Sequence, residues 1–357
     1  MRILSINPGS TSTKIAVYDD LNPVFVQNLK HSADELAPFP SIIHQYDFRK
    51  KIIIEFLQTN GVELHTLDAI VGRGGLLKPI PGGVYRVNEL MIEDLKKGIQ
   101  GEHASNLGGI LAYEIAKNTG KETPAYIVDP VVVDELDEMA RFSGHPLLPR
   151  RSIFHALNQK AVARRFAREH GKKYDEITVI VAHLGGGITV GLHKNGKVID
   201  VNNGLDGEGP FSPERTGTLP AGDLVKLCFS GKYELHEVKK MITGKGGFVA
   251  YLGTNDAYEV EIRAMEKNDE YARKVFFALA YQVAKEIGYL APVVAGKLDA
   301  ILITGGMARS KPITDYITER VQFIAPVHIY PGEDEMQALT EGVYYATKGE
   351  IEIKEYV

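Results

Sequence analysis

One pattern occurs twice in this 357-residue chain and limits its possible folds more than any other feature. Residues 2–19 read as a strand, RILSIN, a turn rich in Gly, Ser and Thr, and a second strand, KIAVYD. Residues 177–203, ITVIVAHLGGGITVGLHKNGKVIDVNN, repeat the order as strand, triple-glycine turn, strand, Asn-Gly turn and strand. The repeat predicts two related halves, each offering a glycine-rich hairpin to one ligand, although the pattern alone leaves two unrelated hairpins open.

A third glycine turn lies near the C-terminus, in DAILITGGMARSKPITDYI. A buried strand is expected to end at Gly305 and Gly306, and a helix to begin near Pro312, where backbone and helix N-terminus can approach a ligand. Helical patterns cover residues 104–120, 158–171 and 269–290, and the first two close on a glycine. Strand and helix alternate in both halves, so the fold class is α/β.

Composition restricts the classes of partner. With 357 residues and 44% hydrophobic residues, two domains with separate cores are expected. The formal net charge is -5 and the basic residues are scattered, which argues against a nucleic acid or an anionic membrane surface and favours a small soluble ligand. The single cysteine, Cys228, excludes an intramolecular disulfide and predicts a reducing cytoplasm. We expect neither a signal peptide nor a membrane span.

The first turn, NPGSTSTK at residues 7–14, is too polar and too short for a linker, and nearly every residue in it offers a hydrogen-bond donor. These donors predict phosphate binding. No G-x-x-x-x-G-K-[ST] string occurs, and no G-x-G-x-x-G follows a strand, so a nucleotide would be held by some other arrangement.

Several polar residues stand where strands are expected to end. Arg73 follows an apolar strand between glycines and could reach an anion, or be an exposed loop arginine. Asp129 closes the strand AYIVD before Pro130, as a strand-tip carboxylate or as a turn former. His103 precedes a helix, where it could also support a cap.

Other candidates carry competing interpretations. His155 and His183 lie in apolar surroundings, which is more typical of core histidines, but three glycines follow His183 directly. Arg215 lies in GEGPFSPERTGTLPAGDL, which has too many Gly and Pro residues for regular structure and indicates a functional loop or disorder. The acidic residues before the last helix, including Glu335, could complement the helix dipole or bind Mg²⁺, and by themselves they favour the dipole.

Together these motifs resemble those of the acetate and sugar kinase, heat-shock and actin superfamily. Within it, NPGSTSTK, HLGGG and TGGMARS resemble the acetate/propionate/butyrate kinase family. The longer strings GRGGLLKPIPGGVY, GEHASNLGGILA, SIFHALNQKA and GLDGEGPFSPERTG resemble its butyrate kinase branch, and the resemblance covers essentially the whole chain.

The resemblance implies two actin-like (ribonuclease H-like) domains with a duplicated mixed-sheet core and a nucleotide cleft between them. The first domain, residues 1–152 plus 337–357, would carry the acyl substrate and phosphate turn; the second, residues 153–336, would bind the nucleotide. The implied reaction is reversible and Mg²⁺-dependent: ATP and a short-chain fatty acid give an acyl phosphate and ADP. The family also implies a homo-oligomer built on a dimer.

The resemblance assigns roles to individual positions. The implied catalytic residues are Asn7, Arg73, Asp129, His155 and Arg215. The implied substrate and phosphate contacts are Ser10, Ser12, Lys14, His103, His183, Gly185, Gly186 and Gly187. The implied nucleotide contacts are Gly305, Gly306, Met307 and Arg309, and the implied metal-positioning residues are Asp129 and Glu335.

Two positions depart from acetate kinases. Gln159 stands where they have a second histidine, and Gly186 where they have an asparagine, so acetate is a less expected substrate and the second hairpin should bind phosphate through backbone amides. The attacking fatty acid is already a carboxylate, with a pKa of about 4 to 5, so no general base is needed. We therefore expect direct transfer inside a cationic cage, without a phosphoenzyme, and with closure of the two domains to exclude water.

Two other functions fit the sequence less well. A sugar kinase of the superfamily needs a carboxylate base and commonly begins its first hairpin with aspartate, where this chain has Asn7. An actin-like or chaperone-like ATPase usually carries inserted subdomains, for which 357 residues leave little room.

Overall fold

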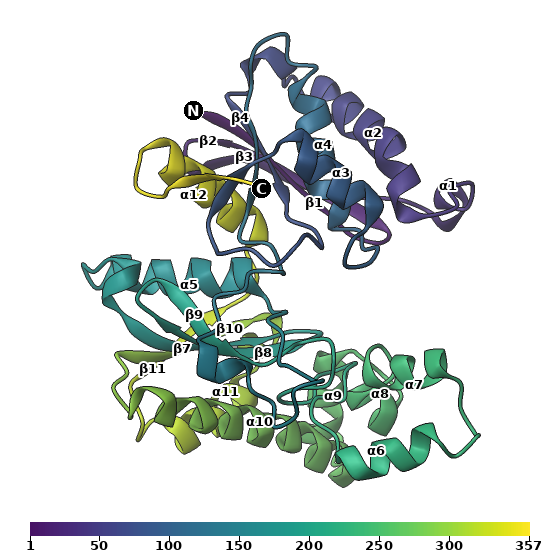
Figure 1. Ribbon diagram of the computed structural model, residues 1–357, viewed down its shortest axis with the longest axis vertical. Coiled ribbons are helices and arrows are strands. Elements are labelled where there is room, and N and C mark those ends of the chain that lie inside the picture. Colours follow the sequence, from purple (N-terminus) through teal and green to yellow (C-terminus); the bar gives the residue numbers. More distant parts are fainter. The chain divides into compact units, whose positions relative to one another are not determined.

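The computed structural model describes all residues, 1–357, and the chain divides into two compact units (Figure 1). Unit 1 contains Met1–Val133 and Asp334–Val357, and unit 2 contains Asp134–Glu333. The chain thus passes from unit 1 to unit 2 after Val133, whereas the first functional domain was expected to extend to residue 152. Residues 134–152 are tied into unit 2, for example by Asp137, whose backbone N–H donates to the Ile199 carbonyl at 2.9 Å. The division into functional domains stays a prediction.

Unit 1 is built on a seven-stranded mixed sheet with the strand order β12-β5-β6-β4-β1-β2-β3. Its strands are β1 (Arg2–Pro8), β2 (Ser12–Asp19), β3 (Asn22–Lys30), β4 (Ala69–Arg73), β5 (Val84–Arg86), β6 (Ala125–Val128) and β12 (Ile353–Glu355). Its helices are α1 (Ala33–Leu36), α2 (Tyr46–Thr59), α3 (Glu89–Lys97), α4 (Asn106–Ala116) and α12 (Glu335–Thr347).

Unit 2 is built on a five-stranded mixed sheet with the order β11-β10-β7-β8-β9. Its strands are β7 (Thr178–Leu184), β8 (Ile188–Lys194), β9 (Lys197–Val201), β10 (Ala300–Gly305) and β11 (Val327–Pro331). Its helices are α5 (Ala156–Glu169), α6 (Ala221–Cys228), α7 (Leu235–Ile242), α8 (Gly247–Leu252), α9 (Ala257–Met265), α10 (Glu270–Leu290) and α11 (Lys311–Val321).

The predicted duplication is confirmed by the two topologies. In unit 1, β1 pairs with β2 and β2 with β3 antiparallel, while β1, β4 and β6 run parallel. In unit 2, β7, β8 and β9 form the same antiparallel series, and β7, β10 and β11 run parallel. The order β3-β2-β1-β4-β6 therefore recurs as β9-β8-β7-β10-β11, and both glycine turns join the first two strands of their series.

Side-chain alternation explains how the sheet of unit 2 holds its helices. Val179 and Val181 point to one face, where they pack with residues of α5. Ile180 and Ala182 point to the other, where they join the core formed with α10 and α11. Since a strand places successive side chains on opposite faces, β7 must be apolar throughout to bury both faces.

In unit 1 the central strand β1 contacts both α4 and α12. The α4 backbone comes unusually close to β4: a Cβ at Gly72 would lie 2.0 Å from the Gly108 carbonyl oxygen, so no larger residue fits. This close approach fixes the end of β4, and with it Arg73, against the start of α4.

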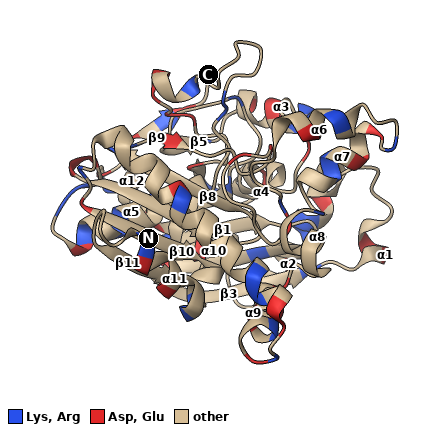
Figure 2. Cartoon of the chain, turned by 90° about the horizontal axis from the view of Figure 1, so that it is seen from below, with Lys and Arg blue, Asp and Glu red and all other residues tan.

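The surface shows the scattered charge that the composition predicts. Positions of Lys and Arg alternate with positions of Asp and Glu along the ribbon in both units (Figure 2). Cys228 is exposed and unpaired. None of the helices combines the length and the apolarity that a bilayer crossing requires.

Candidate functional site

The β1–β2 turn of unit 1 borders a hollow of about 410 Å³. The hollow is lined by Asn7, Pro8, Gly9, Ser10, Ser12, Lys14, Asn28, Arg73 and His103. Six residues predicted from the sequence are thus brought together although they come from three distant parts of the chain. Asn28 was not predicted: it lies on β3 directly opposite Lys14, a neighbour that only the strand register reveals.

Three polar side chains meet at one end of unit 1. Arg73 Nη1 lies 3.0 Å from Glu335 Oε1 and donates to Asn7 Oδ1 at 3.4 Å, and Asn7 Nδ2 donates to Glu335 Oε2. Asn7 and Arg73 lie at the carboxyl ends of the neighbouring parallel strands β1 and β4, and Glu335 is the first residue of α12. Because parallel strands end at the same sheet edge, the sequence places the first two residues together but not the third.

Asp129 is placed differently. It follows β6, is 1% exposed, and does not line the hollow around the β1–β2 turn. Its Oδ1 accepts from the backbone N–H of Gly83 at 2.7 Å, and its own N–H donates to the Gly83 carbonyl at 3.0 Å. Its φ of 38° lies in the left-handed region, a strained conformation for a non-glycine residue that often accompanies functional sites.

In unit 2, His155 and His183 stack with ring centroids 3.9 Å apart and an angle of 13° between their planes. His183 contacts Asn158 Oδ1 through Nδ1 at 2.7 Å, and its Nε2 lies 3.1 Å from Glu333 Oε1. His155 Nδ1 lies 2.9 Å from Thr189 Oγ1. Both predicted histidines therefore belong to one polar cluster, and their nearly parallel planes are fixed by partners on different elements.

Arg215 lies beneath the triple-glycine turn. Its Nη1 donates to the Gly204 carbonyl at 2.7 Å, and a Cβ at Gly187 would lie only 2.0 Å from this nitrogen. The Ser212 hydroxyl donates to the Gly186 carbonyl at 2.6 Å and accepts from the Arg215 N–H at 3.2 Å, which joins loop and turn.

The electrostatic setting of Arg215 favours an anionic ligand. Burial lowers the pKa of its guanidinium below the ordinary value, although the negative charge of Glu214 acts to raise it. Its Nε is buried and has no hydrogen-bond partner. Since buried donors are nearly always paired, this nitrogen suits a ligand oxygen.

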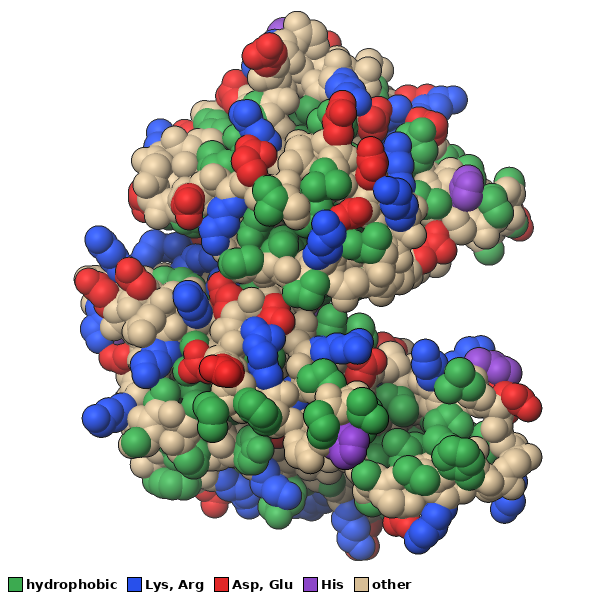
Figure 3. Space-filling model, in the orientation of Figure 1, with side chains coloured by type: hydrophobic (Ala, Val, Ile, Leu, Met, Phe, Trp, Pro, Cys, Tyr) green, Lys and Arg blue, Asp and Glu red, His purple; other side chains and the backbone are tan.

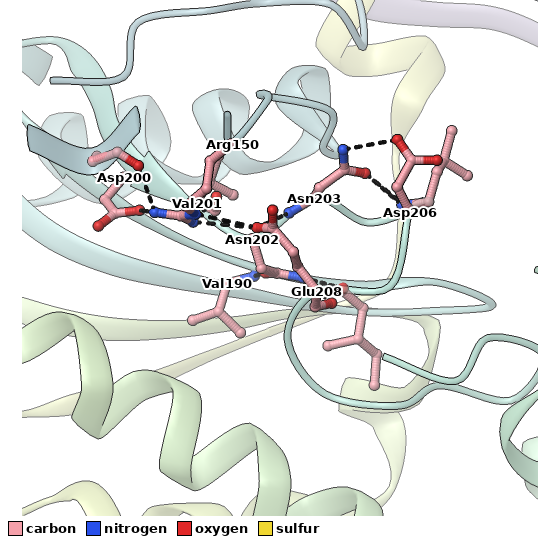
Figure 4. Close-up of polar contacts among 11 residues, drawn as sticks. Arg150, Val190, Asp200, Val201, Asn202, Asn203, Asp206 and Glu208 are labelled. Atoms are coloured by element: carbon pink, nitrogen blue, oxygen red, sulfur yellow. Dashed lines mark hydrogen bonds and ion pairs between the residues drawn. The ribbon is translucent and has the colours of Figure 1, made fainter. Parts of the chain in front are cut away.

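The loop that carries Arg215 is fixed by a network around Arg150 (Figure 4). Arg150 Nη1 pairs with Asp200 at 2.8 Å, its Nη2 donates to the Val201 carbonyl at 2.9 Å, and its Nε lies 3.3 Å from Glu208 Oε2. The same Glu208 oxygen accepts from the Asn203 N–H at 3.1 Å. Arg150 thus links the end of β9 to the loop that leads to Arg215.

Gln159, which departs from acetate kinases, is fully buried. Its Nε2 donates to Thr189 Oγ1 at 2.8 Å, and its Oε1 lies 3.1 Å from His193 Nε2. Sequence reasoning did not identify Thr189, which connects Gln159 to His155. Gln159 therefore helps to fix the position of His155.

The third glycine turn lies against the second one. A Cβ at Gly305, whose φ is 95°, would lie 2.3 Å from the Leu184 carbonyl oxygen, just before the triple glycine. The Gly306 N–H donates to Glu333 Oε1 at 3.4 Å, and Met307 is buried. Arg309 Nη2 would lie 2.9 Å from a Cβ at Gly332, opposite this turn. The predicted nucleotide residues and the triple glycine therefore share one end of the unit 2 sheet.

The predicted metal residues form no ready metal cage. The structure contains no group of three or more His, Cys, Asp and Glu side chains arranged to hold a metal ion. Glu335 is already engaged with Arg73 and Asn7.

Comparison with known proteins places these features in a family. Residues 138–326 match the model of the acetokinase family. The chain is 58% identical over 355 residues to butyrate kinase 2 of Clostridium acetobutylicum, which covers 99% of both chains. The crystal structure of Porphyromonas gingivalis acetate kinase superposes with a TM-score of 0.78 at 17% identity, over 96% of this chain and 98% of that one. A propionate kinase from Francisella tularensis gives 0.75 at 19% identity, over 95% and 98%. These structural similarities confirm the predicted two-domain actin-like fold.

Proposed function

Because this chain belongs to the acetokinase family, we propose that it is a butyrate kinase, which phosphorylates a short-chain fatty acid with ATP and releases the acyl phosphate and ADP. The reaction is reversible. The identity of 58% along essentially the whole of both chains to butyrate kinase 2 carries this proposal.

In unit 1, we assign the hollow beside the β1–β2 turn to the acyl phosphate end of the reaction. Arg73 and His103 line this hollow together with Ser10, Ser12 and Lys14. Because the fatty acid and the terminal phosphate of ATP are both anions, cations at this position reduce their repulsion as they approach. Asn7 orients Arg73 through its side-chain oxygen.

In unit 2, we assign Arg215, His155, His183 and the backbone of Gly185–Gly187 to the transferring phosphoryl group, and Gly305, Gly306, Met307 and Arg309 to the nucleotide. The unpartnered Nε of Arg215 supports its contact with a phosphate oxygen. No side chain is needed to remove a proton from the attacking group, so we propose direct in-line transfer without a phosphoenzyme.

Mg²⁺ fits the carboxylates present, because it usually takes only one or two from the protein and completes its ligands with phosphate and water. We propose that Asp129 and Glu335 position it, and when bound it would neutralise charge on the phosphates. Glu335 would then have to exchange its contact with Arg73, which leaves that guanidinium available for the substrate.

A hydroxamate assay tests the proposal. ATP, Mg²⁺, hydroxylamine and butyrate should yield butyryl hydroxamate, whereas glucose or glycerol in place of butyrate should leave ATP unchanged. ATP consumption with the sugar and none with butyrate would instead identify a hydroxyl kinase. Steady-state kinetics with propionate, butyrate, isobutyrate and isovalerate would rank the acids, since each methylene changes binding by only about 1 to 3 kcal/mol.

We further propose that the protein works in the cytoplasm as a homo-oligomer built on a dimer. Large hydrophobic side chains are exposed on α7 to α9, such as Leu235 at 74% and Tyr258 at 71%. Figure 3 shows hydrophobic atoms gathered over this part of unit 2, and exposed apolar patches of this kind commonly mark contacts between proteins. Light scattering on the purified protein measures the oligomer directly.

A further inference from the structure

Arg49 lies behind the β1–β2 turn and has no exposed surface. It belongs to α2, where it shares the buried face with Ile53 and Leu57, one and two turns further along the helix. A charged side chain at such a position is costly unless it is paired, so its partners indicate its purpose.

The guanidinium of Arg49 binds the turn through its carbonyl groups. Nη1 donates to the carbonyls of Gly9 at 2.8 Å and Ser12 at 2.9 Å, and Nη2 donates to that of Ser10 at 3.0 Å. Further contacts reach Thr13 Oγ1 at 3.1 Å and the side-chain oxygen of Gln45 at 2.8 Å. One side chain therefore fixes the carbonyls at nearly every step of the turn.

All of these partners are neutral. No carboxylate lies within ion-pair distance of Arg49, in contrast to Arg73 and Arg150, which pair with Glu335 and Asp200. Burial lowers the pKa of Arg49 to about 10, so it stays charged at neutral pH. The neighbouring imidazole of His31 supplies no negative charge, and its pKa is itself lowered by burial and by Arg49. The turn therefore lies over a buried positive charge without a counterion.

The donors of the turn face the other way. The backbone N–H groups of Ser10 and Thr11 make no hydrogen bond within the protein, and both residues are exposed. The hydroxyl-bearing Ser10 and Ser12 line the hollow described above. With the carbonyls drawn inward and the amides directed outward, the turn resembles the backbone nests that bind anions.

We propose that Arg49 is the positioning residue of the phosphate turn: it holds the turn carbonyls inward so that the amides face a phosphate group, whose negative charge balances the buried guanidinium. The inference rests on the proposed function only in that this phosphate belongs to ATP or the acyl phosphate. Arg49 does not touch the reacting atoms; it acts through the turn.

The test compares Arg49→Met and Arg49→Lys with the wild type, and uses Arg2→Met as a matched control. Arg2 belongs to β1 of the same hairpin and pairs with Asp19 of β2 at 2.8 Å, at the end of these strands opposite the turn. Thermal unfolding is followed with and without inorganic phosphate, and kcat and KM for ATP are measured with butyrate.

Inorganic phosphate should raise the melting temperature of the wild type and of Arg2→Met, but not that of Arg49→Met. The KM for ATP of Arg49→Met should rise about tenfold or more. Arg49→Lys should show a smaller rise, because lysine restores the positive charge but cannot donate to several carbonyls at once as the planar guanidinium does. A variant that folds only with phosphate present would also support the proposal, since phosphate then replaces what Arg49 supplies.

An Arg49→Met protein with the wild-type phosphate response and KM would overturn the proposal, and so would variants at this position that unfold regardless of phosphate. The two hypotheses fail separately. An Arg49-dependent phosphate response without hydroxamate formation would contradict only the proposed butyrate kinase activity, whereas wild-type turnover by Arg49→Met would contradict only the role of Arg49.

Discussion

The triple-glycine turn offers a sharp test, because two adjacent glycines differ in what a methyl group would meet. A Cβ at Gly187 would lie 2.0 Å from Arg215 Nη1, whereas at Gly186 the nearest atom would be Glu214 Oε1 at 3.8 Å. Neither glycine has a positive φ, so alanine brings no backbone strain at either position. The pair Gly187→Ala and Gly186→Ala therefore isolates the effect of displacing one guanidinium.

The expected magnitude follows from the distance. Ordinary contact begins near 3.4 Å, so the guanidinium must move by more than 1 Å and lose its hydrogen bond to the Gly204 carbonyl. A displacement of about 1 Å in a charge-stabilising group costs roughly 100-fold in rate, or about 2.7 kcal/mol in transition-state stabilisation. Gly187→Ala should lose roughly that factor in kcat/KM for butyrate.

Butyryl hydroxamate formation measures the rate, and thermal unfolding checks that both variants are folded. Gly186→Ala keeps the backbone N–H that we assign to the phosphoryl group, and its methyl group would meet no protein atom closer than 3.8 Å, so its rate should stay well above that of Gly187→Ala. If a folded Gly187→Ala protein matches Gly186→Ala in rate, Arg215 is not held for catalysis in the way described.

Two further predictions concern stability. A Cβ at Gly108 of α4 would lie 2.2 Å from the Arg73 carbonyl oxygen, whereas one at Gly288 of α10 would meet nothing within 4 Å. Gly108→Ala should therefore lower the free energy of unfolding by about 2 to 3 kcal/mol or more, and Gly288→Ala should raise it by about 0.5 to 1 kcal/mol. Denaturant titration measures both changes. Burial raises the pKa of Glu286 from 4.5 to about 7, although the nearby charge of Arg150 acts to lower it. Between pH 4.5 and 7, Glu286 is therefore protonated in the folded chain and ionised in the unfolded chain. The free energy of unfolding should fall as pH rises through this window, and Glu286→Gln should exceed the wild type by on the order of 3 kcal/mol above pH 7 but by little below about pH 4.5; equal stability at all pH values would contradict the assignment.

The fold could be predicted because its main signals are local. Glycine turns between apolar runs located both hairpins and the turn at Gly305, and strand ends located Arg73 and Asn7. The continuous apolar runs of β7 and β10 are explained by helices on both faces of the sheet.

The supporting residues could not be predicted in the same way, because their partners lie far along the chain. Arg49 contacts a turn about forty residues earlier, and the only local signal is an arginine on the face of α2 that carries Ile53 and Leu57. The contact of Glu335 with Arg73 likewise depends on the return of α12 to the first sheet. Composition and spacing report such contacts only when both partners are near in sequence.

In the proposed reaction, arginines bring two anionic reactants together so that phosphate passes directly to a carboxylate. The most direct measurement is the single-turnover rate of butyryl phosphate formation by Arg73→Ala, Arg215→Ala and the double variant, each verified as folded. Each single variant should lose about 10² to 10³ in rate, as when other charge-stabilising donors are removed. A folded double variant that phosphorylates butyrate at the wild-type rate would contradict the account.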